Sequence, residues 1–197
     1  MTLAEYFSTH PRAALAFSGG VDSAYLLWAG KHYGCDLTAY YVHTAFQPEF
    51  EFRDAQRLAQ EVGVPMVVVE TDILVVPLAA ANGPDRCYHC KKALFTKLWE
   101  TARRDGHTLL LDGTTASDDA GDRPGMKALR ELAVESPLRL CGLTKADVRA
   151  ASKEAGLFTW DKPAYACLAT RVPTGRAITR EDLERVEKAE DALFALG

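Results

Sequence analysis

The stretch AALAFSGGVDSAYLLWAG, residues 13–30, decides the fold. The apolar residues from Ala13 to Phe17 predict a buried strand, and an apolar helical pattern begins directly after Ser18-Gly19-Gly20. A strand that passes through a glycine turn into a helix leaves several backbone N–H groups pointing into one small space. The stretch therefore predicts an anion-binding turn suited to phosphate; the alternative is a simple tight turn.

Strand-like and helical segments alternate outward from this turn. Strand-like runs lie at 36–44, 65–72 and 107–115, and helical patterns lie at 22–33, 51–63 and 90–106. This rhythm predicts an α/β fold with a mostly parallel, doubly wound sheet. Ligands of such sheets bind beyond the carboxyl ends of the strands, and that is where the polar clusters lie: Ser18 to Ser23, His43-Thr44, and Asp112 to Asp119.

The second half of the chain is less regular. It contains helical patterns that are limited by Pro137, by Thr144 with Gly156, and by the C-terminus. A stretch rich in Pro and Gly, residues 160–179, predicts a long functional loop. We expect a nucleotide-binding domain over 1–135 and a C-terminal extension over 136–197, made of the Cys167 loop and a terminal helix.

The composition narrows the class of protein. The 197 residues carry a formal net charge of -4, with a pI near 5.7 and no basic arm. This charge disfavours a nucleic-acid partner. No apolar run is long enough for a membrane span, and the start MTLAEYFSTHPR lacks the pattern of a signal peptide. We therefore expect a cytoplasmic protein with neither a nucleic-acid nor a membrane partner.

The residues around the glycine turn suggest its chemistry. Ser18 and Ser23 can donate hydroxyl hydrogen bonds to phosphate. Asp22 would repel phosphate, so its presence predicts a bridging Mg²⁺. The Walker pattern G-x-x-x-x-G-K-S/T is absent, and so is the dinucleotide fingerprint at this turn.

Three cysteines form a second chemical signal. Cys87 and Cys90 lie two residues apart at the start of a predicted helix, whose N-terminus would lower the pKa of the thiols, and Cys167 lies in the long loop. Three thiols suit a 4Fe–4S cluster with one open iron, or a zinc site that lacks its fourth ligand. A Cys87–Cys90 redox disulfide and inert thiols are the alternatives. Cys35 and Cys141 are expected to be plain buried thiols.

These motifs carry a family resemblance. SGGVDS resembles the PP-loop of the ATP pyrophosphatase superfamily, which splits ATP into AMP and pyrophosphate. In order along the chain, FSGGVDSAYLL, DRCYHCKKALF, LDGTTASDDAGDRPGMKAL, LTKADVRAASKEAGL and WDKPAYACLATRVPTG resemble the LarE-type ATP-dependent sulfur transferases. The resemblance implies an adenine nucleotide α-hydrolase-like fold, with residues 1–135 as the PP-loop domain.

The resemblance also implies a reaction. LarE-type enzymes adenylate a carboxylate of a pyridinium dicarboxylic acid mononucleotide and replace AMP with sulfur, in synthesis of a nickel-pincer cofactor. Cys167 corresponds to the sulfur donor, which either gives up its own sulfur and becomes dehydroalanine or works with a 4Fe–4S cluster on Cys87, Cys90 and Cys167. This chain has all three cysteines, which favours the cluster.

The remaining site residues follow from the same resemblance. We expect Cys167 and Asp22 to be catalytic, with ATP and Mg²⁺ as further requirements. The expected contacts to ATP and substrate are Ser18, Gly19, Gly20, Val21, Asp22, Ser23, His43, Gly113, Thr114, Arg123 and Arg171. For the two arginines, surface ion pairs are the alternative; for Asp112, Asp118 and Asp119, either the ATP site or a solvated loop is expected.

Two departures from the family pattern accompany it. The family's GTNADD segment is here Gly113 to Asp119, with one extra residue and no Asn. The family has a further C-terminal segment, so we expect either a truncated chain or a neighbouring protein that supplies the missing groups. The family also suggests a homo-oligomer.

Other functions fit parts of the pattern. A tRNA thiolase also combines a PP-loop with cysteines, but the acidic charge disfavours RNA. An amide-forming synthetase leaves the cysteines unexplained. A non-catalytic nucleotide-binding or sulfur-carrier module is the alternative outside enzymes.

Overall fold

Four parallel strands form the centre of the molecule. The computed structural model describes residues 1–118 and 124–196. The strand order is β3-β2-β1-β4, with β1 at Arg12–Ala16, β2 at Asp36–His43, β3 at Met66–Glu70 and β4 at Leu110–Leu111. Leu15 of β1 lies beside Ala39 of β2 and Leu111 of β4. This arrangement confirms the predicted α/β fold and places the end of β1 centrally at the carboxyl edge of the sheet.

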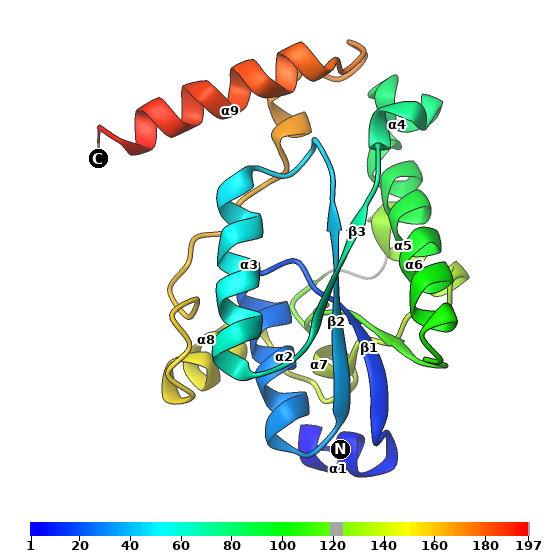
Figure 1. Cartoon of the computed structure of the whole chain (residues 1–197), viewed down its shortest axis with the longest axis vertical. Helices are drawn as coiled ribbons and strands as arrows, with labels where there is room; N and C mark the ends of the chain where they lie inside the picture. The colour runs from blue at the N-terminus through cyan, green and yellow to red at the C-terminus, as the bar shows by residue number, and fades with distance from the viewer. Residues whose placement is uncertain (119–123, 197) are drawn as a thin grey trace.

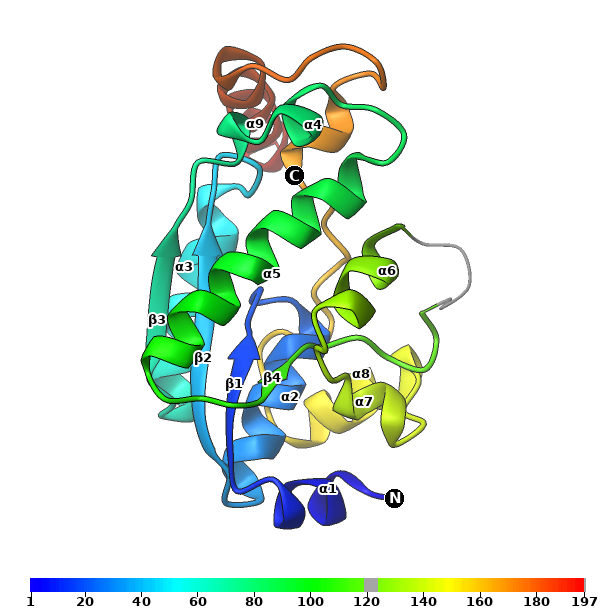
Figure 2. The same ribbon diagram turned by 90° about the vertical axis from the view of Figure 1, so that its right-hand side faces the viewer.

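Helices cover both faces of the sheet, as a doubly wound fold requires (Figures 1 and 2). One face packs against α2 (Val21–His32) and α3 (Glu49–Val62), and α8 (Lys145–Glu154) packs on α2 and joins the same core. The other face packs against α5 (Arg86–Arg104), and α6 (Pro124–Glu131) packs on α5. Along β1 the side chains alternate between the two cores: Leu15 lies in the first, and Ala14 in the second. The strands are therefore buried on both sides.

Local sequence explains several helix ends. Thr144 and Asp147 form a reciprocal capping box at the start of α8, which confirms the predicted N-cap. A second capping box, Thr2 with Glu5, starts α1 (Leu3–Thr9), a helix that our sequence analysis did not predict. Gly63, at φ +72°, ends α3 in the left-handed conformation that glycine adopts without strain.

The structure differs from the expected elements at three places. The strand expected over 107–115 is reduced to β4, because the chain turns away after Leu111 to form a polar loop. Helix α5 begins at Arg86 instead of residue 90 and so includes Cys87. Pro137 starts the short helix α7 (Pro137–Leu140), since proline fits the first helical position.

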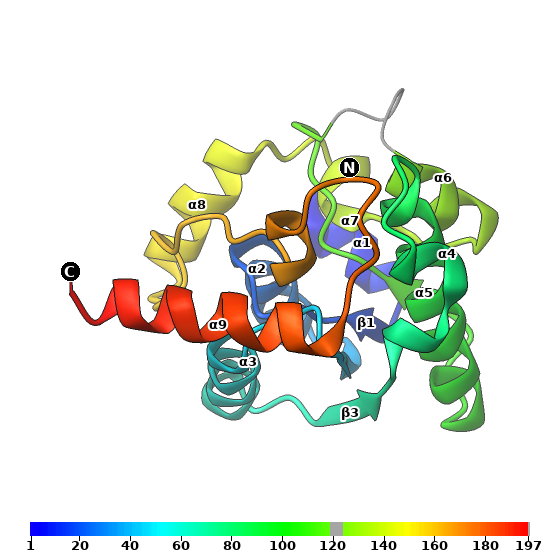
Figure 3. The same ribbon diagram turned by 90° about the horizontal axis from the view of Figure 1, so that it is seen from above.

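The C-terminal part lies across the carboxyl edge of the sheet. After α8 the chain passes through a loop and the 3₁₀ turn η2 (Leu168–Arg171) into α9 (Arg180–Phe194), which spans the top of the molecule (Figures 1 and 3). On the other side of this edge lie η1 (Ile73–Val75) and α4 (Pro77–Ala80). The boundary between 1–135 and 136–197 stays a prediction.

A third hydrophobic cluster fills the space below α9. Its buried members are Phe46, Ile73, Ala79, Leu168, Ala169, Val172, Ile178 and Leu183. The segment expected to be a long loop is thus packed through four of its own apolar side chains. Within the described ranges, no helix is both long and apolar enough to cross a membrane.

Candidate functional site

The turn after β1 is shaped by Gly19. This residue has φ +74°, and a Cβ there would lie 2.9 Å from the Cβ of Ala55 on α3. Only glycine combines this backbone conformation with so close an approach. The next residue, Gly20, is the N-cap of α2 and no side chain caps the helix. The first-turn N–H groups of α2, including that of Val21, are therefore available to an anion.

Ser18 and Ser23 face each other across this turn. Their Oγ atoms lie 3.1 Å apart, and the Ser23 hydroxyl donates to the Gly20 carbonyl at 3.1 Å. The backbone N–H of Ser18 also donates to Ser23 Oγ. Both hydroxyls thus point into the turn, where the sequence analysis expected them to meet phosphate oxygens.

Asp22 lies in the first turn of α2 and is the most unusual carboxylate of the site. Lys145 donates to its Oδ2, whereas its Oδ1 is buried and has no hydrogen-bond partner among the described residues. Burial raises the pKa of Asp22, the charges of Lys145 and Arg149 oppose this, and the nearby Asp118 adds to it. A buried carboxylate oxygen without a partner is costly. It is also the type of hard oxygen ligand that Mg²⁺ takes, so the donor chemistry fits this ion.

The loop after β4 closes against the same turn. A Cβ at Gly113 would lie 2.8 Å from the backbone nitrogen of Ser23, so glycine lets this loop contact the start of α2. Asp112 is buried and accepts hydrogen bonds from Thr114 Oγ1 at 2.6 Å and Ser136 Oγ at 2.5 Å. Gly113 and Thr114 are therefore beside the turn, with the Thr114 hydroxyl engaged by Asp112.

Asp118 belongs to the same loop after β4. Asp118 accepts from the backbone N–H and the hydroxyl of Thr115 through Oδ2, at 2.9 and 3.0 Å, and Arg139 donates to its carbonyl. Arg123 and Asp119 lie outside the described residues. Their expected contacts with substrate and ATP stay predictions.

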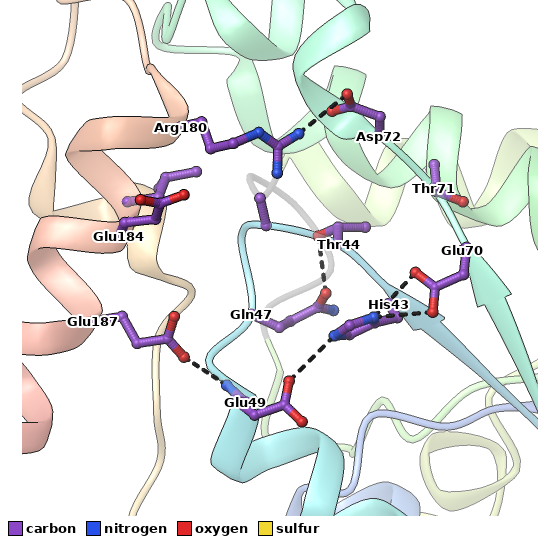
Figure 4. A pocket seen from close by; sticks show the side chains of 12 residues that line it. His43, Thr44, Gln47, Glu49, Glu70, Thr71, Asp72, Arg180, Glu184 and Glu187 are labelled. Carbon is purple, nitrogen blue, oxygen red and sulfur yellow. Dashed lines mark hydrogen bonds and ion pairs between the residues drawn. The ribbon is translucent and has the colours of Figure 1, made fainter.

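His43 lines a cavity of about 490 Å³ beyond β2 and β3 (Figure 4). Its Nδ1 lies 3.0 Å from Glu70, its Nε2 lies 3.6 Å from Glu49, and its ring stacks on Phe52 with a centroid distance of 4.7 Å. Five carboxylates line the cavity: Glu49, Glu70, Asp72, Glu184 and Glu187.

The charge of this cavity limits what it can bind. Among the described residues that line the cavity, Arg180 provides the positive charge, and it pairs with Asp72 at 3.3 Å (Figure 4). Residues of the glycine turn do not line it. An acidic cavity repels phosphate, so a triphosphate would lie towards the glycine turn. A contact between His43 and adenine stays a prediction.

The three cysteines come together from two segments. Cys87 and Cys90 occupy the first two turns of α5, and Cys167 directly precedes η2. Cys90 and Cys167 pack against the third hydrophobic cluster, and Cys87 is exposed. Both Cys90 and Cys167 are partly buried, and each lies close enough to another cysteine of the trio for that cysteine's charge to affect its pKa.

The pKa values of the trio correct one expectation. The start of α5 was expected to lower the pKa of its thiols. Burial instead raises the pKa of Cys90 to about 12, reinforced by Cys167 and Cys87 and opposed by Arg86. Burial also raises the pKa of Cys167, again opposed by Arg86. Desolvation thus outweighs the helix N-terminus at Cys90.

A metal at the trio can be tested against the geometry. In the part of the chain that the structure describes, no three His, Cys, Asp or Glu residues are arranged to hold a metal ion. The expected zinc site therefore has no support. The same finding on the described residues gives no support to the expected 4Fe–4S cluster on Cys87, Cys90 and Cys167, which stays a prediction. Of the other cysteines, Cys35 is buried as predicted and Cys141 is partly buried.

Arg171 holds the Cys167 loop instead of pointing into open solvent. Its Nε donates to Glu190 of α9 at 2.6 Å, and its NH1 donates to the carbonyl of Ala166 at 2.7 Å. Tyr165 donates to the same carboxylate of Glu190. A role of Arg171 in binding substrate phosphate stays a prediction, and it requires the Glu190 ion pair to open.

Two cations at the site were missed by the sequence analysis. Lys145 pairs with Asp22, and Arg149, one turn later on α8, donates to the carbonyls of Trp160 and Lys162 at 2.7 and 2.8 Å. The signal was present: both lie at helical spacing in LTKADVR, directly after the N-cap Thr144. A cation one residue inside a helix start is unfavourable unless an anion compensates it.

Comparison with known proteins gives relatives along nearly the whole chain. No family model matches. An uncharacterised protein of Synechocystis is 38% identical over 99% of this chain and 73% of its own length. The pyridinium-3,5-bisthiocarboxylic acid mononucleotide synthase of Lactiplantibacillus plantarum is 35% identical over 94% of this chain and 68% of its own length. A tRNA-specific 2-thiouridylase of Thermobifida fusca is 27% identical over 77% of this chain and 51% of its length.

Proposed function

This chain belongs to the LarE family of PP-loop proteins, that of pyridinium-3,5-bisthiocarboxylic acid mononucleotide synthase, with an adenine nucleotide α-hydrolase-like fold; on this premise we propose that it is an ATP-dependent sulfur transferase. Its substrate would be a small pyridinium dicarboxylate mononucleotide, and its product would serve the synthesis of a nickel-pincer cofactor. The best support for the proposal is that the chain combines two features. The glycine turn leaves the start of α2 uncapped by any side chain, and three cysteines lie at the start of α5 and directly before η2.

The first step would be adenylation. An oxygen of the substrate carboxylate attacks the α-phosphorus of ATP, and the bond to the leaving pyrophosphate breaks. The N–H groups at the start of α2 and the hydroxyls of Ser18 and Ser23 would hold the leaving phosphates. Asp22 would hold Mg²⁺ through its unpartnered Oδ1, and this ion would supply neutralisation of the charge on pyrophosphate. Lys145 would keep Asp22 in place.

The second step would be sulfur transfer. The adenylate gives the substrate a good leaving group, and sulfur attacks its carbonyl carbon while AMP departs. In the sacrificial route Cys167 supplies the sulfur: its Cα proton is removed, its Cβ–Sγ bond breaks, and dehydroalanine remains. In the cluster route Cys87, Cys90 and Cys167 would hold a 4Fe–4S cluster, which would supply sulfide that it takes up from an external sulfide donor. We favour the cluster, because the chain has all three thiols.

Two measurements test this function. The first is the products of ATP: the proposal requires AMP and pyrophosphate, and release of ADP would contradict it. The second compares anaerobically purified protein with Cys87→Ala, Cys167→Ala and the control Cys141→Ala. A cluster gives broad absorbance at about 400 nm, and we expect Cys87→Ala and Cys167→Ala to abolish it. A colourless protein that loses the mass of one H₂S at Cys167 during turnover would establish the sacrificial route.

The 2-thiouridylase relatives support a second candidate, a tRNA thiolase. Against it stand the net charge of -4 and the five carboxylates that line the cavity beyond β2 and β3. Dependence of pyrophosphate release on added tRNA would favour this candidate, and dependence on a carboxylate-bearing nucleotide would favour the first.

A further inference from the structure

Asn82 has an unusual conformation and environment. It lies between α4 and α5 with φ +57°, and only 1% of its surface is exposed. Its Nδ2 donates to the carbonyls of Val172, Pro173 and Arg176 at 3.2, 3.0 and 3.0 Å. The main-chain carbonyl of Asn82 accepts from the backbone N–H of Gly175 at 2.9 Å. The turn at 172–176 is therefore wrapped around one buried amide.

Arg86 continues this network towards the cysteines. It is the first residue of α5, directly before Cys87. Its NH1 donates to Asn82 Oδ1 at 2.5 Å and to the carbonyl of Ala169 at 2.9 Å. Ala169 lies in η2, two residues after Cys167. One guanidinium thus bridges the helix that carries two of the thiols and the loop that carries the third.

We propose that Asn82 and Arg86 are positioning residues that clasp the Cys167 loop onto the start of α5, so that the three thiols present sulfur at one point. This inference rests on the proposed function, because it assigns a purpose to the convergence of the thiols. The contacts of the clasp with the Cys167 loop join residues 83 to 94 positions apart in the sequence, and they need both side chains.

Hydrophobic packing alone does not account for this position. Leu168 and Val172 would bury their side chains in the third cluster in several registers of the loop, because hydrophobic attraction has no direction. Hydrogen bonds from a charged donor to a carbonyl fix both distance and direction. Asn is also one of the few residues other than glycine that adopts positive φ at low cost. The identity of both residues is thus explained by the clasp.

The closing experiment measures thiol proximity without reference to activity. Reduced full-chain protein in a Cys87→Ser background is treated with a short bis-maleimide, and the Cys90–Cys167 cross-link is quantified by peptide mass spectrometry. The variants are Arg86→Ala, Arg86→Lys and Asn82→Gly; glycine retains the positive φ. The matched control is Arg104→Ala, at the exposed far end of the same helix. Far-UV circular dichroism selects variants that are folded.

The clasp predicts that Arg86→Ala and Asn82→Gly lower the cross-link yield roughly tenfold, because each removes strong, partly buried hydrogen bonds. Arg86→Lys restores part of the yield, and Arg104→Ala changes nothing. An undiminished cross-link in a folded Arg86→Ala or Asn82→Gly protein would overturn the inference. If Arg86→Ala does not fold, Arg86→Lys and Asn82→Gly decide the question.

A second readout separates positioning from general stability. In the Cys87-containing protein, the clasp variants should release pyrophosphate at the normal rate but transfer sulfur about tenfold more slowly, with partial rescue in Arg86→Lys. Equal loss of both steps would overturn a positioning role. If the parent protein releases no pyrophosphate at all, the proposed function is wrong. The cross-linking yield still tests whether Asn82 and Arg86 position the Cys167 loop.

Discussion

Lys145, at the start of α8, forms an ion pair with one carboxylate oxygen of Asp22, at the start of α2, while the other oxygen is buried and no described residue bonds to it. The two residues lie 123 positions apart. Their pairing ties the C-terminal half of the chain to the glycine turn. Asp22 also places a carboxylate beside the turn that we propose to bind phosphate, and a Mg²⁺ ion between the two would remove their repulsion.

Asp22→Asn tests this arrangement. The neutral amide keeps the shape but is a poor ligand for Mg²⁺, so we expect formation of AMP and pyrophosphate to fall roughly 100-fold or more. The free energy of unfolding should change little, because a buried charge with one unsatisfied oxygen is removed. Asp36→Asn is the control, since Asp36 is exposed and pairs with Arg12 at 3.4 Å. Full activity of Asp22→Asn would contradict the role given to Asp22.

Gly19→Ala should destabilise the protein more than Gly34→Ala. Both residues have positive φ, +74° and +82°, but a Cβ at Gly19 would meet Ala55 at 2.9 Å, whereas nothing lies within 4 Å of one at Gly34. Backbone strain costs about 1–2 kcal/mol at each site, and overpacking adds about 1–3 kcal/mol at Gly19 alone. Urea denaturation of the two variants gives the difference. Equal losses in the free energy of unfolding would show that the turn at Gly19 moves away from Ala55 without an energetic penalty.

Lys162→Met removes the cation of a largely buried ion triad. Lys162 lies 2.9 Å from Glu51 and 2.7 Å from Asp54 of α3, and its side chain is 14% exposed. Two carboxylates would be left without their counter-ion, so we expect a loss of about 3 kcal/mol. Arg57→Met, which breaks the exposed pair with Glu61, should cost under about 1 kcal/mol. Similar costs in thermal denaturation would mean that water solvates the triad.

Cys35 should make stability depend on pH in the alkaline range. Burial raises the pKa of its thiol from 9.0 to about 11 in the folded state. As the pH rises from about 9 to about 11, the unfolded chain loses this proton first, so the free energy of unfolding falls. Below pH 9 this contribution is constant. Cys35→Ala lacks it, and the two proteins should converge in stability as the pH rises; a constant difference would contradict the prediction.

Local features of the fold were predictable from sequence. The strand–glycine–helix pattern at 13–30 fixes β1, the turn and α2 through nearest neighbours in the chain. The N-cap Thr144 was predictable for the same reason, since the capping box spans three residues. At the site, the positions of Ser18, Asp22 and Ser23 followed from this local geometry.

Features that depend on distant residues were not predictable. The partners of Arg86 and Asn82 lie 83 to 94 positions away in their contacts with the Cys167 loop, and a single sequence does not reveal such pairs. The pKa of Cys90 depends on how deeply the third hydrophobic cluster buries it, which outweighs the local helix N-terminus that the sequence displays. The acidic cavity needs α9 to return across the sheet before it exists.

The clasp also has a consequence for biosynthesis. Translation delivers Cys87 and Cys90 long before Val172 to Arg176, whose carbonyls Asn82 requires. While the chain is still growing, Cys87 and Cys90 lack Cys167 and the apolar side chains of the loop that carries it. If the trio carries sulfur as we propose, its loading would therefore follow completion of the polypeptide.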